Sequence, residues 1–237
     1  MTHTGYLKRY RFPIEVMRFA VILNIFLPSR AVVILLFALF RAKVTHKTVC
    51  EWSKKFNNYA DDVTFDYSDI KHLICHVDEK FIKIAGERAY WWTIKDCLGN
   101  IIHSIISMSR DLISAKKLFK ESRAKINRDV DLLARDGCFS YEKATKHLGR
   151  KCKTLITGIN GKGILYKKYY YYLTNNPAES VNSEIDTFMT RFQRNFRNVE
   201  SAERHKNNFI LQKRLKRSFA EQKLSETSSL LTLAIKL

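Results

Sequence analysis

The chain has 237 residues, with 42 Lys and Arg against 23 Asp and Glu, which gives a net charge of +19. Its 46% hydrophobic content, 3 Pro and 8 Gly exclude the disordered, collagen-like and Pro/Gly-linker classes. Such a charge indicates a polyanionic partner, either nucleic acid or an acidic membrane surface. The five cysteines include no Cys-x-x-Cys pair, so reduced thiols are expected rather than a disulfide framework or a zinc site.

The positive charge is concentrated at the two ends of the chain. Residues 1–60 carry +8 and residues 187–237 carry +7, whereas residues 61–186 carry +4. This partition favours an enzyme that acts on nucleic acid, with basic arms around a folded middle. The most apolar run, residues 31–40, is about half of the ~20 residues that span a bilayer, and the N-terminus lacks a signal-peptide pattern. We therefore expect no membrane partner.

Residues 1–60 are predicted to form three short helices, over residues 13–25, 29–40 and 45–55. Ser29 or its neighbour is expected to cap the second helix, and Thr45 the third, because hydroxyl oxygens accept from the free N–H groups of a first turn. A tight turn before a basic last helix favours a DNA-binding helix-turn-helix domain over a plain helical bundle with a solvated basic face.

The third helix is expected to contact DNA bases. Val49 and Trp52 are predicted to face inward, and the polar positions to face outward. The DNA-binding candidates are His46, Lys47, Thr48, Glu51, Lys54 and Lys55. The apolar run at residues 31–40 is unusual for such a domain, so we expect it to be buried against another domain or a second subunit.

From residue 71 the pattern changes to that of strands. Three runs rich in β-branched and aromatic residues, broken at Gly86 and Gly99, predict an antiparallel meander, and the first run is expected to contain a turn. Further elements are predicted as a helix at 111–126, a strand at 129–137, a helix at 140–148, a strand at 152–158 and a helix at 177–195. This order predicts an α/β, ribonuclease H-like (retroviral integrase-like) catalytic core over residues 70–197, followed by a basic helical segment at 198–237.

Three acidic residues lie at distinctive positions in this order of predicted strands and helices. Asp78 lies among apolar residues of the first strand, Asp136 ends the fourth strand, and Glu179 lies in the first turns of the last core helix. The first and fourth strands of a ribonuclease H-like sheet are neighbours, so the three carboxylates are predicted to converge. Converging carboxylates require a cation, and hard oxygen ligands select Mg²⁺ or Mn²⁺. Two such ions activate a water or a 3′-hydroxyl for phosphoryl transfer.

Each carboxylate also has an ordinary structural explanation. Asp136 precedes Gly137, as a turn residue does, and Glu179 complements the positive end of a helix dipole. Asp78 is harder to explain in this way, because an Asp among apolar strand residues needs a partner. The joint placement of the three residues favours a functional site over three separate explanations.

Together these segments resemble the small insertion-sequence transposases with an Asp-Asp-Glu triad, most closely the insertion sequence six family of bacteria and archaea. The likeness covers nearly the whole chain. It includes the N-terminal helices, HVDEKFIKIAGERAYWWTIKD with Asp78, LLARDGCFSY with Asp136, and NNPAESVNSEIDTFMTRFQRNFRNVESA with Glu179. The resemblance implies metal-dependent cleavage at the element's ends, which are terminal inverted repeats, and attack of the freed 3′-hydroxyl on target DNA. It also implies a homodimer and a cytoplasmic, nucleoid-associated place in a prokaryotic cell.

Two features depart from the family pattern. The 43 positions from Asp136 to Glu179 exceed the usual spacing, and GINGKGILYKK looks like the insertion responsible. About two helical turns after the glutamate the family tends to have Lys or Arg, but this chain has Asp186, whose charge would repel phosphate. Asp186 favours a second hypothesis, a catalytically decayed relative that only binds DNA. A third hypothesis is a nuclease of the same fold that cuts without joining.

Overall fold

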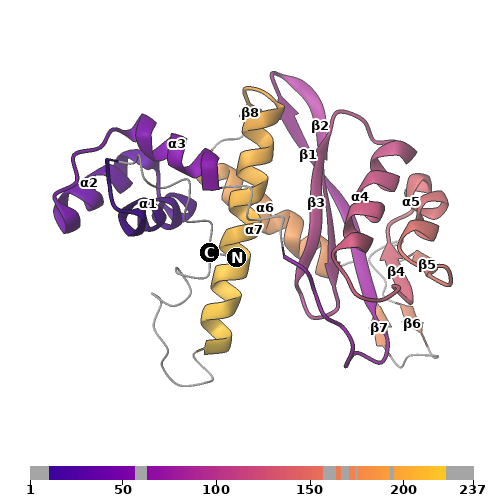
Figure 1. The fold of residues 1–237 in the computed structure, drawn as a ribbon. Helices are drawn as coiled ribbons and strands as arrows, with labels where there is room; N and C mark the ends of the chain where they lie inside the picture. Colours follow the sequence, from indigo (N-terminus) through magenta and orange to yellow (C-terminus); the bar gives the residue numbers. More distant parts are fainter. Residues whose placement is uncertain are drawn as a thin grey trace. The chain divides into compact units, whose positions relative to one another are not determined.

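A computed structural model describes residues 11–56, 63–156, 164–166, 171–173, 176–192 and 195–222. Within these ranges, the side chains of residues 56, 164–166, 171–179, 191–192 and 219–222 lie outside the description. The chain divides into two compact units (Figure 1). The first unit consists of residues 1–61 and 207–237, and the second of residues 62–206.

The first unit begins with three helices, which are α1 (Ile14–Phe26), α2 (Ser29–Phe40) and α3 (His46–Phe56). The predicted cap of α3 is confirmed, because the Thr45 hydroxyl oxygen accepts from the Thr48 N–H at 3.2 Å. Ser29 does not cap α2. Pro28 occupies the N-cap position, and the Ser29 hydroxyl instead donates to the side-chain oxygen of Asn24 at 2.8 Å.

The three helices share an apolar core. Val49 and Trp52 of α3 are 0% and 5% exposed, as predicted. They pack with residues of the other two helices, among them Met17, Ala20, Val32 and Leu36. The second half of α7 (Val199–Gln222) belongs to the same unit, where Leu211 and Leu215 are buried against Ile25 of α1.

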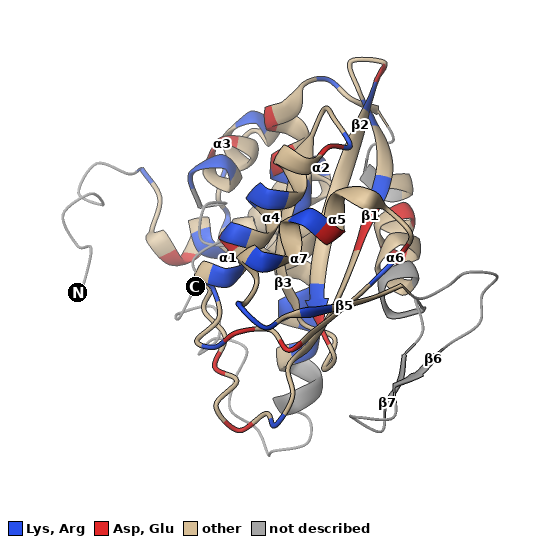
Figure 2. Ribbon diagram, turned by 90° about the vertical axis from the view of Figure 1, so that its right-hand side faces the viewer, with Lys and Arg blue, Asp and Glu red and all other residues tan. Residues whose placement is uncertain are grey.

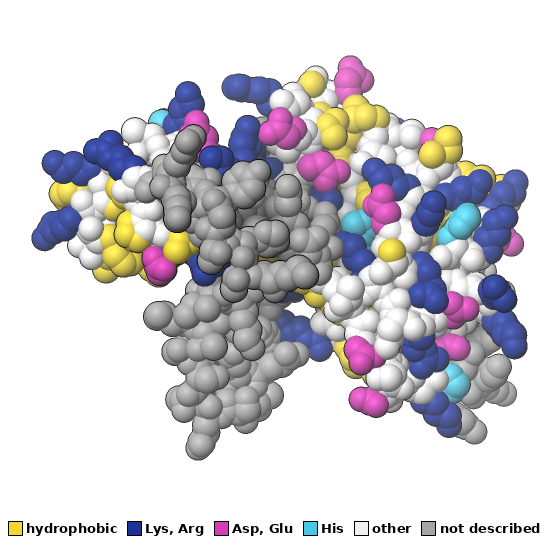
Figure 3. Space-filling model, viewed as in Figure 1, with side chains coloured by type: hydrophobic (Ala, Val, Ile, Leu, Met, Phe, Trp, Pro, Cys, Tyr) yellow, Lys and Arg dark blue, Asp and Glu magenta, His cyan; other side chains and the backbone are white. Residues whose placement is uncertain are grey.

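The apolar run of α2 is not fully buried among the described residues. Four large side chains of this helix are exposed by 44–69%, namely Ile34, Phe37, Leu39 and Phe40. Hydrophobic side chains gather on this N-terminal part of the molecule (Figure 3). The expectation that residues 31–40 pack against another domain or a second subunit stays a prediction. Among the helices in the part of the chain that the structure describes, none is both long and apolar enough to cross a membrane.

The second unit is built on a mixed sheet with the strand order β3-β2-β1-β4-β5. Its strands are β1 (Ile74–Ile84), β2 (Glu87–Asp96), β3 (Ile101–Ser107), β4 (Leu132–Arg135) and β5 (Lys153–Ile156), and β8 (Asn195–Phe196) also pairs with β1. The first three strands form the predicted antiparallel meander, whereas β1, β4 and β5 run parallel. The turn expected inside the first run is wrong, because β1 is one continuous strand of 11 residues.

The β1–β2 connection is a two-residue turn. Ala85 and Gly86 both have a positive φ, 52° and 87°, between the paired residues Ile84 and Glu87. A turn of this kind matches the twist of the two strands, and glycine adopts such a φ at low cost. The sequence break at Gly86 thus marks the end of the strand that carries Asp78.

Helices cover both faces of the sheet. On one face lie α4 (Leu112–Ala124) and α5 (Phe139–Ala144), followed by the short 3-10 helix η2 (Thr145–His147), and on the other lies α6 (Asn176–Phe192) (Figure 1). Alternate residues of β1 point to opposite faces. Cys75 and Val77 enter the core that includes Trp92, Phe119 and Tyr141. Two short strands, β6 (Ile164–Tyr166) and β7 (Tyr171–Leu173), form a separate hairpin sheet.

Candidate active site

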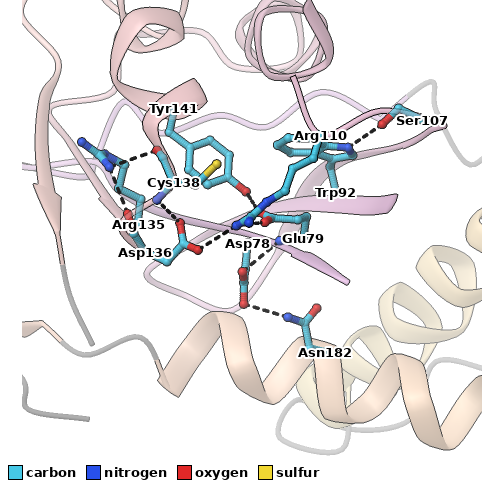
Figure 4. A network of polar contacts seen from close by, with 10 residues as sticks. All are labelled: Asp78, Glu79, Trp92, Ser107, Arg110, Arg135, Asp136, Cys138, Tyr141 and Asn182. Carbon is cyan, nitrogen blue, oxygen red and sulfur yellow. Dashed lines mark hydrogen bonds and ion pairs between the residues drawn. The ribbon is translucent and has the colours of Figure 1, made fainter. Parts of the chain in front are cut away.

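Asp78 and Asp136 come together because β1 and β4 are neighbouring parallel strands. In their register His76 pairs with Ala134, so Asp78 lies two residues beyond the pair and Asp136 directly follows the end of β4. Side-chain oxygens of Asp78, Glu79 and Asp136 all lie within 4.8 Å of one another (Figure 4). Two of the three carboxylates predicted to converge are therefore close together, and an adjacent glutamate joins them.

Asp78 lies on the face of β1 that α6 covers. Its carboxylate accepts from the side-chain amide of Asn182 in α6 at 2.7 Å and from the backbone N–H of Glu79 at 2.9 Å. The amide of Asn182 thus orients one oxygen of Asp78, and the backbone orients the other.

Glu79 points to the opposite face, toward the core. Its side chain is only 5% exposed, it accepts from the Tyr141 hydroxyl, and it forms an ion pair with Arg110. Burial raises the pKa of Glu79, and the contacts with Tyr141 and Arg110 oppose this rise. Burial, together with the nearby Glu79 charge, raises the pKa of Tyr141 far above its ordinary value, so its hydroxyl stays protonated and donates.

Asp136 is held by the loop that follows β4. Its carboxylate accepts from the backbone N–H of Cys138 at 2.8 Å and from Arg110 at 3.2 Å. Arg135 donates to the backbone oxygens of Asp136 and Cys138 at 3.0 and 3.2 Å. Asp136 is therefore a turn residue as well as a member of the cluster, and the two explanations are compatible.

The position of Glu179 is known only at the level of its helix. Glu179 is the fourth residue of α6, and its side chain lies outside the described part of the structure. Asn182, three positions later on α6, donates to Asp78.

Asp186 is paired with a cation from the sheet. Its carboxylate lies 2.5 Å from the ammonium group of Lys80 on β1. The negative charge that the sequence places in this part of α6 is thus opposed by a positive charge next to it.

Three residues of the site were not predicted from the sequence, namely Glu79, Arg110 and Tyr141. An acidic residue at a core-facing position of a strand is a signal in itself, because buried carboxylates need partners. Arg110 precedes α4 and Tyr141 lies in α5, and only the packing of these helices on the sheet brings them to Glu79.

The donor chemistry of the cluster fits a hard divalent cation. Asp78, Glu79 and Asp136 offer carboxylate oxygens, which are the ligands that Mg²⁺ and Mn²⁺ prefer. Three close carboxylates also repel one another, and Arg110 relieves part of this repulsion through Glu79 and Asp136. The residues present can therefore hold such an ion.

The candidate DNA-binding residues lie on α3, in the first unit. Thr48 is half-buried, and its hydroxyl group lies 3.0 Å from that of Thr45. The other five are exposed to solvent, namely His46, Lys47, Glu51, Lys54 and Lys55. Positive residues also occur on α4 and α5 of the second unit (Figure 2). Exposure is what base or phosphate contacts require, and it does not distinguish between them.

Comparison with known proteins finds a family match that covers most of the second unit and continues into α7. A family model described as a DDE domain, from transposases of the IS240 type, matches residues 72–218. This match and the mixed α/β sheet together support a ribonuclease H-like integrase core. A comparison with curated proteins finds no match.

Two solved structures show a distant likeness. A chain of the simian T-cell lymphotropic virus intasome, solved in complex with PP2A regulatory subunit B56 gamma, is 10% identical with a TM-score of 0.36, covering 75% of this chain and 60% of its own length. Endonuclease V from Bacillus subtilis is 12% identical with a TM-score of 0.24, covering 76% of this chain and 95% of its own.

Proposed function

The chain belongs to the DDE-domain transposases, and from this premise we propose that it is an active transposase of the insertion sequence six type. It cleaves DNA at the ends of its element and joins the freed 3′ ends to target DNA. The observation that carries the proposal is the approach of Asp78 and Asp136, from neighbouring strands, to within 4.8 Å. The family match supports the same reaction class.

We assign Asp78, Asp136 and Glu179 as the catalytic and metal-binding residues. The ions are two Mg²⁺ or Mn²⁺, which when bound activate the attacking hydroxyl and stabilise the leaving oxygen. The side chains of the protein hold the geometry. The Asn182 amide fixes one oxygen of Asp78, and the Cys138 N–H fixes one oxygen of Asp136.

We also assign roles to three segments of the protein and infer that it is a homodimer. Residues 1–60 form the helix-turn-helix domain that contacts the terminal inverted repeats, residues 70–197 the catalytic domain, and residues 198–237 a basic C-terminal segment. The solvent-exposed polar face of α3 supports the DNA contacts. The exposed apolar side chains of α2 support a homodimer, because a second subunit would remove them from water.

A second candidate function is that of a decayed relative that binds DNA without cutting it. The observation that favours it is Asp186, a negative charge on the helix that covers Asp78. The ion pair between Asp186 and Lys80 weakens this reading, because it offsets that charge.

The proposal is tested with purified protein, labelled element-end DNA and a target plasmid, in Mg²⁺ or Mn²⁺ and in EDTA. We expect metal-dependent joined product from the wild type. Asp78→Asn should abolish cleavage and joining, because it removes a charged oxygen ligand, while end binding stays intact. Asp69→Asn, which changes an exposed aspartate of the same unit, is the matched control and should stay active.

Two outcomes would contradict the assignment. Cleavage by Asp78→Asn would show that the carboxylate cluster is not the active site. Specific end binding by the wild type, with no cleavage in either metal, would establish the decayed DNA-binding relative instead.

A further inference from the structure

We propose that Lys80 is the phosphate-binding cation of this site and that Asp186 is its positioning residue, an inference that rests on the proposed function. Lys80 lies two residues beyond Asp78 on β1, so both side chains share the strand face that α6 covers. The Lys80 ammonium lies 2.5 Å from the Asp186 carboxylate. Asp186 follows Asn182 by four residues, and the Asn182 amide donates to Asp78 at 2.7 Å. One face of α6 therefore contacts both Asp78 and Lys80.

Lys80 can leave Asp186 and bind another anion at a low cost in free energy. The two side chains are 25% and 57% exposed, and ion pairs in such surroundings contribute little to stability because water screens them. Replacing the carboxylate oxygen by a DNA phosphate oxygen exchanges one charge-assisted hydrogen bond for another. Arg110 differs from Lys80 in this respect. It is paired with Glu79, and withdrawing it would leave a carboxylate that is 5% exposed without its cation.

Asp186 also keeps the lysine away from Asp78. Residues two apart on a strand are separated by about 7 Å, a distance that an extended lysine side chain can cover. Without Asp186, the Lys80 ammonium would pair with Asp78 and compete with a divalent cation for that carboxylate. Asp186 thus keeps Lys80 from competing with the metal for Asp78 and holds Lys80 beside that carboxylate for the phosphate.

The first test is binding of the full-length protein to a fluorescent random-sequence duplex in EDTA, over a series of salt concentrations. We expect Lys80→Gln to bind several-fold more weakly and to lower the salt slope by about one, the value for one lost phosphate contact. Lys80→Arg should bind like the wild type, and Asp186→Asn equally well or more tightly. Lys117→Gln, which removes an exposed lysine of α4, is the control for a general loss of charge.

The second test is a calorimetric titration with Mn²⁺ in the absence of DNA. Asp186→Asn should bind Mn²⁺ more weakly, because the released Lys80 competes for Asp78. The double variant Lys80→Gln/Asp186→Asn should bind Mn²⁺ like the wild type. A structural link between α6 and β1 would not produce this rescue.

Three results would overturn the inference. The first is a salt dependence of DNA binding in Lys80→Gln that equals that of the wild type. The second is a loss of DNA affinity in Asp186→Asn that is as large as in Lys80→Gln. The third is Mn²⁺ binding by the double variant that stays as weak as in Asp186→Asn. If Lys80→Gln does not fold, Lys80→Met, which also removes the charge, replaces it in both tests. Neither measurement needs cleavage. A wild type that binds but never cuts would therefore refute the proposed function and leave this inference standing.

Discussion

The environment of Glu79 disfavours a charge, because its carboxylate is almost completely shielded from water. Burial raises its pKa above the ordinary value of 4.5, and Tyr141 and Arg110 only oppose the rise. A raised pKa means that the folded protein retains a proton that the unfolded chain has already released. The contribution of Glu79 to the free energy of unfolding is therefore most favourable below pH 4.5 and falls as the pH rises through the raised pKa.

Replacing Glu79 by Gln should remove this pH dependence. We expect the stability of Glu79→Gln relative to the wild type to improve as the pH is raised from about 4 to about 7, because the variant carries no buried charge. Urea unfolding at several pH values measures the difference. Glu142→Gln, at a carboxylate that is 61% exposed, is the control and should follow the wild-type pH dependence. An unchanged pH dependence in Glu79→Gln would show that Glu79 does not titrate as a buried acid.

The residues of the site differ in how far the sequence could predict them. Asp78 and Asp136 were predictable, because an Asp among strand apolars and an Asp at a strand end both stand out against the hydrophobic pattern. Arg110 and Tyr141 were not, since their partner Glu79 is 31 and 62 positions away in the chain. The Lys80–Asp186 pair spans 106 positions, and the sequence shows only the negative residue in an unusual place.

Among the elements, the β1–β2 hairpin depends most on one residue. Gly86 has φ of +87°, and its N–H donates to the side-chain oxygen of Asn195 in β8 at 3.3 Å. Its neighbour Ala85 also has a positive φ, and its N–H donates to the Phe196 carbonyl at 2.7 Å. The turn therefore joins β1, β2 and β8 at the end of the strand that carries Asp78.

We expect Gly86→Ala to destabilise the protein by about 1–2 kcal/mol, the cost of a left-handed conformation for a residue with a Cβ atom. Thermal or urea unfolding measures this loss. Gly137→Ala is the control, because Gly137 lies outside the left-handed region and an added Cβ there meets no atom within 4 Å. If Gly86→Ala were as stable as Gly137→Ala, the positive φ at residue 86 would not constrain the turn.

Hydrophobic periodicity predicted most helices and strands, but it misplaced an interruption. The three N-terminal helices and the strand order through β5 agree with the prediction, because their apolar residues repeat with helix or strand spacing. The expected turn inside β1 was wrong. The polar segment Asp78–Lys80 interrupts the apolar residues of this strand, and its side chains find partners on both faces of the sheet. Such partners lie elsewhere in the chain and leave no local signal.

For the molecule as a whole, the main feature is that the first unit combines the two ends of the chain. Ile25 of α1 is 2% exposed, and the residues that bury it include Leu211 and Leu215 of α7. The sequence predicted a basic helical segment at residues 198–237, which includes these two leucines. It gave no sign of their partner, because helical periodicity identifies an apolar face and not what that face contacts.

Leu211→Ala should therefore destabilise α1 and make its local unfolding more frequent. We expect the first unit to lose about 2–3 kcal/mol, as a leucine truncated in a small buried cluster does. Hydrogen exchange of the backbone amides should become faster in α1 and stay unchanged in β1. Lys216→Ala, an exposed position of the same helix, should change neither element. Unchanged exchange in α1 of Leu211→Ala would show that the cluster around Ile25 does not support that helix.

The discontinuous first unit also affects the order of events during synthesis. Translation delivers α1, α2 and α3 first, but the leucines that cover Ile25 are made after every strand of the carboxylate-bearing sheet. A nascent chain can therefore bury Val49 and Trp52 early, while Ile25 waits until α7 leaves the ribosome. An interrupted chain that ends before Leu211 would contain Asp78 and Asp136 but lack a finished N-terminal unit. Completion of that unit thus waits for the part of α7 that carries Leu211 and Leu215.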